Sequence, residues 1–213
     1  MPQKNLGIIG GGQLGSMLSQ AAKKLNIRST IYSDDADAPA QNFCDEFIYG
    51  NYNDKKKVLE FASKVDVITY EFENIPYETL NEMDKLKSVL PKPSVNRLIQ
   101  HRIAEKDFIN KLNIRTTRYV SIEKKTDIEK LGDFLPGILK TTTMGYDGKG
   151  QYPLKKIEDV NSLNIDFSKE YILEKIVKLK KEISVIVSRF GINNFEIYEP
   201  IENTHKDLSL IHI

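Results

Sequence analysis

The first part of the chain alternates short apolar runs with segments of helical periodicity. Leu6–Ile9 and Val65–Tyr70 are apolar runs of strand length. Between them, Leu14–Leu25 places apolar residues at the i, i+3, i+4 and i+7 positions of an amphipathic helix. Alternating strands and helices are typical of a parallel sheet covered by helices. We therefore predict an α/β fold whose N-terminal domain, residues 1–98, is a doubly wound parallel sheet.

The pattern changes after Pro91-Lys92-Pro93, where two prolines interrupt the chain. Two short helices are expected near Ser94–Gln100 and Arg102–Leu112. Strands then dominate, and Glu182–Ser188 alternates strictly between its two faces. The region after residue 98 is therefore predicted to be a sheet-rich α+β region, and we expect it to be incomplete at Ile213.

Composition narrows the possible classes of protein. Lys and Arg number 31 and Asp and Glu 30, so the net charge of the 213 residues is +1, which argues against nucleic-acid binding by bulk charge. No apolar stretch approaches the roughly 20 residues of a membrane helix. The single Cys44 excludes an internal disulfide and a multi-cysteine metal site, and the three histidines lack zinc-ligand spacing. A soluble, cytoplasmic protein that binds neither nucleic acid nor a membrane is expected.

The first glycine loop, Gly10–Gly15, satisfies the G-x-G-x-x-G pattern between a predicted strand and a predicted helix. Asp34 follows about twenty residues later, where a ribose-binding acid would lie in a dinucleotide fold. Glycines let the backbone approach an anion, but this property does not specify NAD. Three interpretations stay open at this point: a dinucleotide site, a site for another phosphorylated ligand, and tight packing of the strand against the helix.

A second glycine-rich loop carries more specific chemistry. A predicted strand ends at Lys140, and the loop that follows contains Lys149 and glycines at positions 145, 148 and 150. Open backbone amides and lysine ammonium groups can bind and neutralise phosphate oxygens. The alternative is a surface hairpin whose glycines serve turns, but three glycines exceed what a turn requires. This loop therefore indicates a nucleotide-phosphate site.

Motifs along nearly the whole chain resemble the ATP-grasp carboxylate–amine ligases, in particular the branch that carboxylates an aminoimidazole ribonucleotide. They are IIGGGQLGSML, TYEFENIP, QHRIAEKDFINKLNI, LKTTTMGYDGKGQ, YILEKIVKLKKEISVIVSR and EPIENTHK. The resemblance implies a Rossmann-like pre-ATP-grasp domain over residues 1–98 and a small ATP-grasp lid subdomain over residues 99–172. Residues 173–213 would begin the large ATP-grasp subdomain, which we expect to be truncated.

The resemblance also implies which residues bind ATP. In the family an arginine and a lysine contact the nucleotide, and these positions match Arg102 and Lys140. A ribose carboxylate matches Glu182, and a further nucleotide contact matches His205. The loop over the phosphates matches Gly145, Tyr146, Asp147, Gly148, Lys149, Gly150 and Gln151, and the adenine hinge matches Glu174, Lys175, Ile176 and Val177.

For the imidazole substrate, the family uses the part of the loop that matches Tyr146, Asp147 and Lys149, together with an acid that matches Glu71 or Glu73. Each assignment has a simpler alternative. The two acids could be solvated loop residues. Arg102 and Lys106 could form an ordinary exposed helix face, Glu182 could pair with nearby lysines, and His205 alone indicates nothing.

The reaction implied by the resemblance belongs to de novo purine biosynthesis. Bicarbonate attacks the γ-phosphate of ATP, and the resulting carboxyphosphate carboxylates the amine of 5-aminoimidazole ribonucleotide. ATP and Mg²⁺ are the implied cofactors, and the expected partners are small molecules and a second subunit in a homodimer of the full-length enzyme. No metal ligand is assigned within residues 1–213, because the family's magnesium ligands are expected in a later part. We expect these residues alone to be inactive.

Other functions remain as alternatives. The first is another ATP-grasp ligase, such as a formate-dependent glycinamide ribonucleotide transformylase. An NAD-dependent oxidoreductase would use the first glycine loop and Asp34 but leaves Lys140–Gln151 without a role. A non-catalytic nucleotide-binding module is the third. The final residues, Leu208–Ile213, depart from the family pattern, and we interpret them as non-native read-through.

Overall fold

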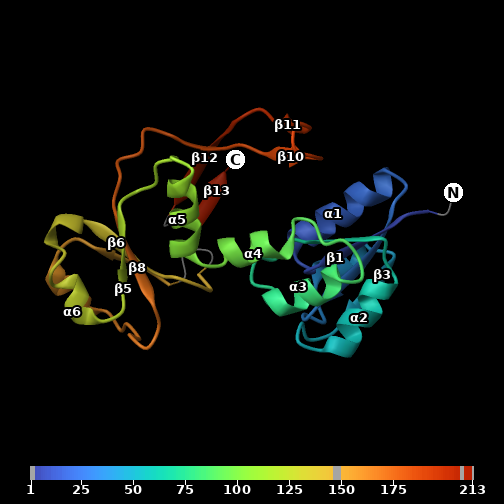
Figure 1. Ribbon diagram of the computed structural model, residues 1–213, viewed down its shortest axis with the longest axis horizontal. Helices are drawn as coiled ribbons and strands as arrows, with labels where there is room; N and C mark the ends of the chain where they lie inside the picture. Colours follow the sequence, from blue (N-terminus) through green and yellow to red (C-terminus); the bar gives the residue numbers. More distant parts are fainter. Residues whose placement is uncertain (1–2, 146–149, 207–208, 213) are drawn as a thin grey trace. The chain divides into compact units, whose positions relative to one another are not determined.

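The computed structural model describes residues 3–145, 150–206 and 209–212 (Figure 1). The chain forms two compact units, Met1–Glu105 and Lys106–Ile213, called here the N-terminal and the C-terminal unit. The boundary between them falls within helix α5 (Arg102–Lys111). The finer division into segments 1–98, 99–172 and 173–213 stays a prediction.

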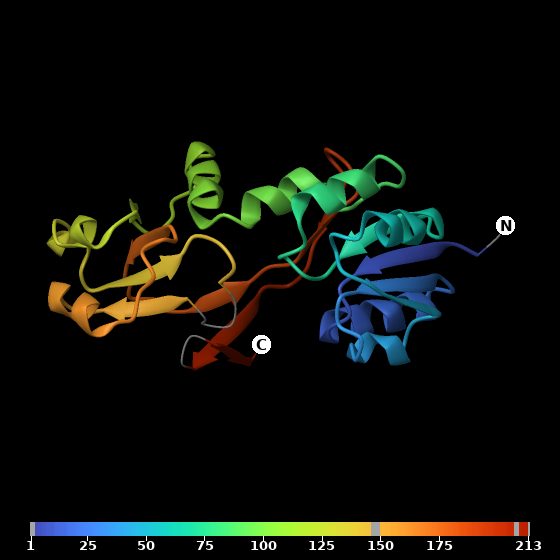
Figure 2. The same cartoon turned by 90° about the horizontal axis from the view of Figure 1, so that it is seen from below.

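The N-terminal unit contains a four-stranded parallel sheet, which confirms the predicted fold class. Its strands are β1 (Asn5–Ile9), β2 (Arg28–Ser33), β3 (Glu46–Tyr49) and β4 (Val67–Tyr70), in the order β3-β2-β1-β4. All three neighbouring pairs run parallel. The helices are α1 (Gln13–Lys24), α2 (Lys55–Ser63), α3 (Tyr77–Asp84) and α4 (Pro93–Ile99), with a short 3₁₀ turn η1 (Pro39–Asn42). Figure 2 shows α1 on one side of the sheet and the teal helices on the other.

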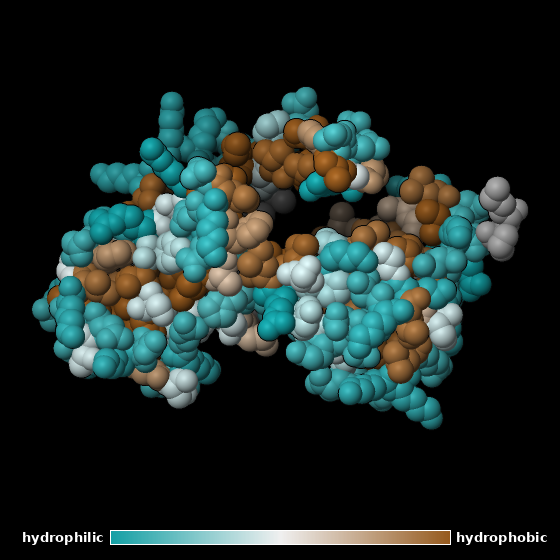
Figure 3. Space-filling view, viewed as in Figure 1, coloured by the Kyte–Doolittle hydropathy of each residue, from teal (hydrophilic) through white to brown (hydrophobic). Residues whose placement is uncertain are grey.

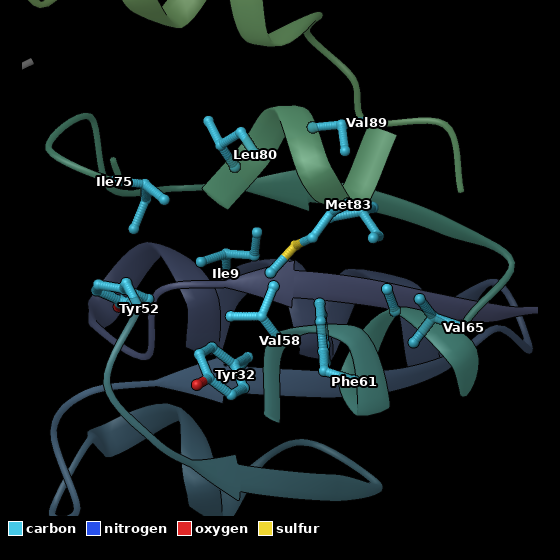
Figure 4. Packing of buried hydrophobic residues seen from close by; sticks show 12 residues of the cluster. Ile9, Tyr32, Tyr52, Val58, Phe61, Val65, Ile75, Leu80, Met83 and Val89 are labelled. Atoms are coloured by element: carbon cyan, nitrogen blue, oxygen red, sulfur yellow. The ribbon is translucent and has the colours of Figure 1, made fainter. Parts of the chain in front are cut away.

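Both faces of this sheet are buried, as expected for parallel strands. Successive residues of a strand point to opposite faces, and β1 illustrates this. Ile9 belongs to the large cluster formed with α2 and α3, whereas Ile8 packs on the other side with Ile31 and Ala40. Within the large cluster, the Phe61 ring lies 5.5 Å from the Tyr32 ring (Figure 4).

Helix α1 forms where the periodicity predicts it, but its large apolar residues do not face the core. The exposed positions are Leu14, Met17, Leu18 and Leu25, and the buried positions are Gly15, Ser16, Ser19 and Ala22. A Cβ at Gly15 would lie 2.7 Å from the Gly10 carbonyl oxygen, so the helix approaches the glycine loop too closely for larger residues. The apolar surface over α1 is visible in brown in Figure 3.

The C-terminal unit begins with an antiparallel sheet. Its strands are β5 (Tyr119–Ile122), β6 (Gly137–Thr141), β7 (Gln151–Leu154) and β8 (Tyr171–Lys175), in the order β5-β8-β6-β7. One face packs on α6 (Lys125–Ile128), η2 (Gly132–Phe134) and η3 (Ile157–Ser162) through a cluster that includes Leu139 and Leu173. The other face carries Lys140, Ile172 and Glu174, which alternate with the core residues along their strands.

Five short strands follow: β9 (Glu182–Ser184), β10 (Val187–Arg189), β11 (Phe195–Ile197), β12 (Ile201–Lys206) and β13 (Ser209–His212). The predicted single strand Glu182–Ser188 is divided, because β9 pairs with β12 while β10 pairs with β11. Many apolar side chains remain exposed here, including Ile183, Ile192 and Ile197. Within the described residues, no helix has the length and apolar character needed to cross a lipid bilayer.

The core of the N-terminal unit yields a stability prediction. Phe61→Ala should lower the free energy of unfolding by about 3–5 kcal/mol, because it leaves a cavity beside Tyr32. Leu59→Ala on the same helix is the matched control, since Leu59 is 40% exposed, and it should cost less than about 1 kcal/mol. Urea unfolding followed by circular dichroism measures both losses, and equal losses would contradict the assigned core.

Candidate functional site

A buried carboxylate between two lysines lies on the face of the β5-β8-β6-β7 sheet that points away from the Leu139 and Leu173 core. Glu174 on β8 contacts the Lys140 ammonium of β6 through Oε2 at 2.7 Å. Its Oε1 lies 3.0 Å from the Lys106 ammonium of α5. We call these three residues the Lys106–Glu174–Lys140 cluster.

The strand register explains how this cluster forms. Lys140 pairs with Ile172, so Lys140 and Glu174 are diagonal neighbours on one face, while Leu139 and Leu173 point into the core. Tyr119 of β5 pairs with Glu174, and the Lys106 ammonium lies 5.6 Å from the centre of the Tyr119 ring. The Tyr119 hydroxyl also donates to Asp107, which ties α5 to β5.

The electrostatics of the cluster favour the ionised carboxylate. The Glu174 side chain is 10% exposed, and those of Lys106 and Lys140 are 17% and 18% exposed. Burial raises the pKa of Glu174, but the hydrogen bonds and charges of Lys140 and then Lys106 outweigh it and lower the pKa below its ordinary value. Two ammonium groups therefore face one carboxylate, and the cluster carries one net positive charge.

A pocket of about 380 Å³ lies beside this cluster. It is lined by Thr117, Ile138, Glu174, Lys175, Ile176, Val177 and Leu179. All four residues of the predicted adenine hinge are among them. The volume is in the range of small-molecule sites, and the lining combines apolar side chains with few polar groups.

Hydrogen bonds hold the backbone of this pocket in place. The Thr117 hydroxyl donates to the Lys175 carbonyl at 2.7 Å, and the Lys175 N–H donates to the Arg118 carbonyl. The Ile176 N–H donates to the Pro136 carbonyl at 3.1 Å. Among the described residues, the Val177 N–H has no hydrogen-bond partner. The Val177 N–H, two residues past the end of β8, is therefore available to a ligand in the pocket.

The predicted phosphate loop connects β6 and β7, which pair as an antiparallel hairpin. The Thr141 N–H donates to the Gly150 carbonyl at 2.9 Å. Gly150 has φ +70, and a Cβ there would lie 2.7 Å from the Thr141 hydroxyl, so this glycine is required by the hairpin itself. Gly145 and Gly150 flank the segment Tyr146, Asp147, Gly148 and Lys149, which lies outside the described residues, and Gln151 begins β7.

The remaining predicted nucleotide contacts lie on other elements. Arg102 begins α5, one turn before Lys106. Glu182 begins β9 and accepts a hydrogen bond from the Asn203 side chain at 3.2 Å. His205 lies in β12, and its side chain is outside the described part of the chain. Their assignment to ATP stays a prediction.

Glu71 and Glu73 follow β4 in the N-terminal unit and have different surroundings. The Glu71 carboxylate accepts a hydrogen bond from the Gly12 N–H at 2.8 Å. Glu73 is exposed, while its backbone carbonyl accepts from the Gln100 side chain at 2.6 Å. Gln100 also donates to the Ile75 carbonyl at 2.7 Å, so the loop after β4 is fixed at both ends.

The first glycine loop therefore holds a side chain of the same chain. Gly10 has φ +102, and a Cβ there would lie 2.8 Å from the Glu71 carboxylate. A Cβ at Gly12 would lie 3.0 Å from the same oxygen. Of the three interpretations of this loop, the contact with Glu71 favours close packing, and the carboxylate also stabilises the α1 N-terminus. A dinucleotide phosphate would have to displace this carboxylate.

Metal ligands were not found in the part of the chain that the structure describes, where no three His, Cys, Asp or Glu side chains cluster. The one carboxylate of the Lys106–Glu174–Lys140 cluster has both oxygens engaged by ammonium groups. The described residues therefore do not fit the implied Mg²⁺. A second pocket, of about 200 Å³, lies in the N-terminal unit beside Lys55 and Glu82 and contains none of the predicted site residues.

Two residues of this site were not predicted as functional from the sequence. The sequence offers for Lys106 only an exposed helix face, although its spacing of four from Arg102 on a helix is a usable signal. Thr117 carried no signal, because its role depends on a pairing with Lys175 that is distant in sequence.

Comparisons with known proteins agree with this architecture. Residues 3–100 match the ribonucleotide synthetase preATP-grasp domain, and residues 107–212 match the ATP-grasp domain. The chain is 37% identical over 211 residues to the N5-carboxyaminoimidazole ribonucleotide synthase of Brucella melitensis, covering 97% of this chain and 58% of that protein.

Two solved structures are similar to the whole described fold. The N5-carboxyaminoimidazole synthetase of Staphylococcus aureus complexed with ADP has a TM-score of 0.90 at 33% identity, covering 97% of this chain and 56% of that one. The carboxyaminoimidazole ribonucleotide synthase of Aspergillus clavatus complexed with ATP has a TM-score of 0.87 at 26% identity, covering 98% and 56%. The chain spans a little over half the length of these relatives.

The lowered pKa of Glu174 predicts a pH dependence of stability. Because the folded-state pKa lies below the ordinary value of 4.5, the ionised carboxylate stabilises the fold above that pH. This stabilisation is lost as the pH falls through the lowered folded-state pKa. Glu174→Gln should cost about 3 kcal/mol near neutral pH, because it leaves two partly buried ammonium groups without a carboxylate.

The same variant should lose less stability than the parent between about pH 6 and about pH 3. Urea midpoints measured across this range test the expectation. Glu158→Gln, at an exposed position of η3, is the matched control and should follow the parent. Parallel pH profiles for the parent and Glu174→Gln would contradict the assigned role of the carboxylate.

Proposed function

Because the chain belongs to the ATP-grasp superfamily and is homologous to the N5-carboxyaminoimidazole ribonucleotide synthases, we propose that it forms the nucleotide-binding part of such a ligase. The enzyme would carboxylate 5-aminoimidazole ribonucleotide with ATP and bicarbonate. The observation that carries the proposal is the pocket at Glu174–Val177 beside the positively charged Lys106–Glu174–Lys140 cluster.

The pocket provides what an adenine base requires. A planar base would lie among Ile138, Ile176 and Leu179, and the Val177 N–H would donate to a ring nitrogen. The bond from Thr117 to the Lys175 carbonyl holds the preceding residue in place, so this donor is preorganised. Relatives solved with ADP and with ATP support a nucleotide as the ligand.

The triphosphate would extend from the base toward Lys140 and the hairpin loop. Lys140 lies near the end of β6, immediately before that loop. Phosphoryl transfer depends mainly on positioning and on neutralisation of charge, which a net positive cluster and backbone amides supply. Arg102, Glu182 and His205 are proposed as further contacts of the nucleotide, on the basis of the family resemblance.

The imidazole substrate would be held by residues at two places. Tyr146 and Asp147 are proposed to orient its amine, and Lys149 to steady the carboxyphosphate. Of the two acids after β4, we assign the substrate contact to Glu73, because the Glu71 carboxylate is engaged by the Gly12 N–H. Glu71 then acts indirectly, by holding the loop that carries Glu73.

Further parts of the proposal rest on the resemblance alone. Mg²⁺ would neutralise phosphate oxygens, with ligands other than the described residues. A cytoplasmic location and a homodimeric full-length enzyme are proposed on the same basis.

The activity test is phosphate release from ATP by the full-length protein that carries this chain. Release should require both bicarbonate and 5-aminoimidazole ribonucleotide. Lys149→Ala should lower turnover by about 10²-fold or more if its charge stabilises the transition state. Phosphate release that continues when bicarbonate or 5-aminoimidazole ribonucleotide is omitted would contradict the proposal. A rise in melting temperature with NAD but not with ATP would also contradict it.

The proposed hinge predicts a specific effect on ATP affinity. Val177→Pro removes the backbone donor and should weaken ATP binding by about tenfold or more, because a base nitrogen loses its partner. Val177→Ala keeps the N–H and should bind within about twofold of the parent. Isothermal titration with ATP measures both, and equal affinities for the two variants would exclude this donor from recognition.

A further inference from the structure

Lys106 is a partly buried lysine to which the family resemblance gives no role. Its side chain is 17% exposed, and its ammonium lies 3.0 Å from the Glu174 Oε1. The ring of Tyr119 lies beneath it at 5.6 Å. A lysine in this position is held by three elements, α5, β5 and β8, and is not a solvated side chain on a helix surface.

The charges of the cluster show what Lys106 contributes. Lys140 alone with Glu174 would be a neutral pair, since the two groups lie 2.7 Å apart. A neutral pair offers little attraction to a phosphate group, because the carboxylate opposes the ammonium at nearly the same distance. With Lys106 on the other carboxylate oxygen, one positive charge remains.

The geometry also separates the two lysines on the carboxylate. Lys106 contacts Oε1 and Lys140 contacts Oε2, so neither displaces the other. Among the residues that the structure describes, removing Lys106 would leave Lys140 as the one ion-pair partner of a carboxylate that is 10% exposed. A buried carboxylate retains its remaining counter-ion strongly, so Lys140 would be held by Glu174.

We infer that Lys106 is a positioning residue for nucleotide phosphate, which compensates Glu174 and thereby leaves the charge of Lys140 available to the ligand. This inference rests on the proposed function, because it takes the ligand to be a nucleoside triphosphate in the Glu174–Val177 pocket. The ligand chemistry that it predicts is an adenine nucleotide whose affinity depends on its phosphates.

The test compares ATP with adenosine, which lacks phosphates, by isothermal titration of the full-length protein that carries this chain. Lys106→Met keeps the length of the side chain but removes its charge. It should weaken ATP binding by about tenfold or more and leave adenosine binding within about twofold of the parent. Lys106→Arg should retain ATP affinity, and Lys111→Met, at an exposed position of the same helix, should match the parent.

A compensating variant separates charge from packing. Lys106→Met combined with Glu174→Gln removes one charge of each sign and leaves Lys140 unneutralised. ATP affinity should then recover to within about threefold of the parent, although two contacts have been lost. Lys106→Met keeps the ion pair of Glu174 with Lys140, so the carboxylate retains a counter-ion, and urea unfolding of both variants checks that the titrated proteins are folded.

The outcomes distinguish the two proposals. If the parent binds neither ATP nor adenosine, the nucleotide pocket fails, and this inference fails with it. If the parent binds ATP and Lys106→Met binds equally well, only the role of Lys106 is overturned. Equal weakening of ATP and adenosine, or no recovery in the double variant, would likewise overturn the charge-based role. Loss of ATP affinity alone, followed by recovery, supports it.

Discussion

The C-terminal unit depends on the compensation of one buried carboxylate. Glu174 is 10% exposed, and an ion of this kind is costly to bury unless opposite charges and hydrogen bonds surround it. Lys106 and Lys140 provide both, and they come from α5 and β6. The cluster therefore joins three elements that are distant in sequence. Because two lysines face one carboxylate, the cluster keeps one net positive charge beside the Glu174–Val177 pocket.

In the N-terminal unit, a backbone N–H group rather than a lysine compensates a carboxylate. Glu71 is engaged by the Gly12 N–H at the start of α1, where the helix dipole favours a negative charge. A glycine pattern that is typical of dinucleotide binding thus holds the carboxylate of its own chain. The spacing of glycines specifies that an anion can approach the backbone, but it does not specify whether that anion is a ligand or a side chain.

Much of the fold could be predicted from periodicity, whereas contacts between distant residues could not. The strands of the parallel sheet and the strand that ends near Lys140 follow from local apolar runs. The orientation of α1 was not predictable from its apolar positions, because Gly15 and neighbouring small residues decide which face can approach the loop. The division of Glu182–Ser188 depends on pairing with β11 and β12. The distinction between Glu71 and Glu73 required the position of Gly12.

The candidate site shows why residue identity alone is an incomplete description of phosphate binding. A lysine that matches an ATP-contacting position contributes to affinity only if its charge is not already neutralised within the protein. The Lys140 ammonium is 2.7 Å from the Glu174 carboxylate, so its contribution to phosphate affinity depends on what else that carboxylate contacts. Glu174 lies near the end of β8 and is also the first of the four hinge residues that line the pocket. The useful unit for comparing relatives is therefore the set of Lys106, Lys140 and Glu174, because a change in any one of them alters the charge that the other two present.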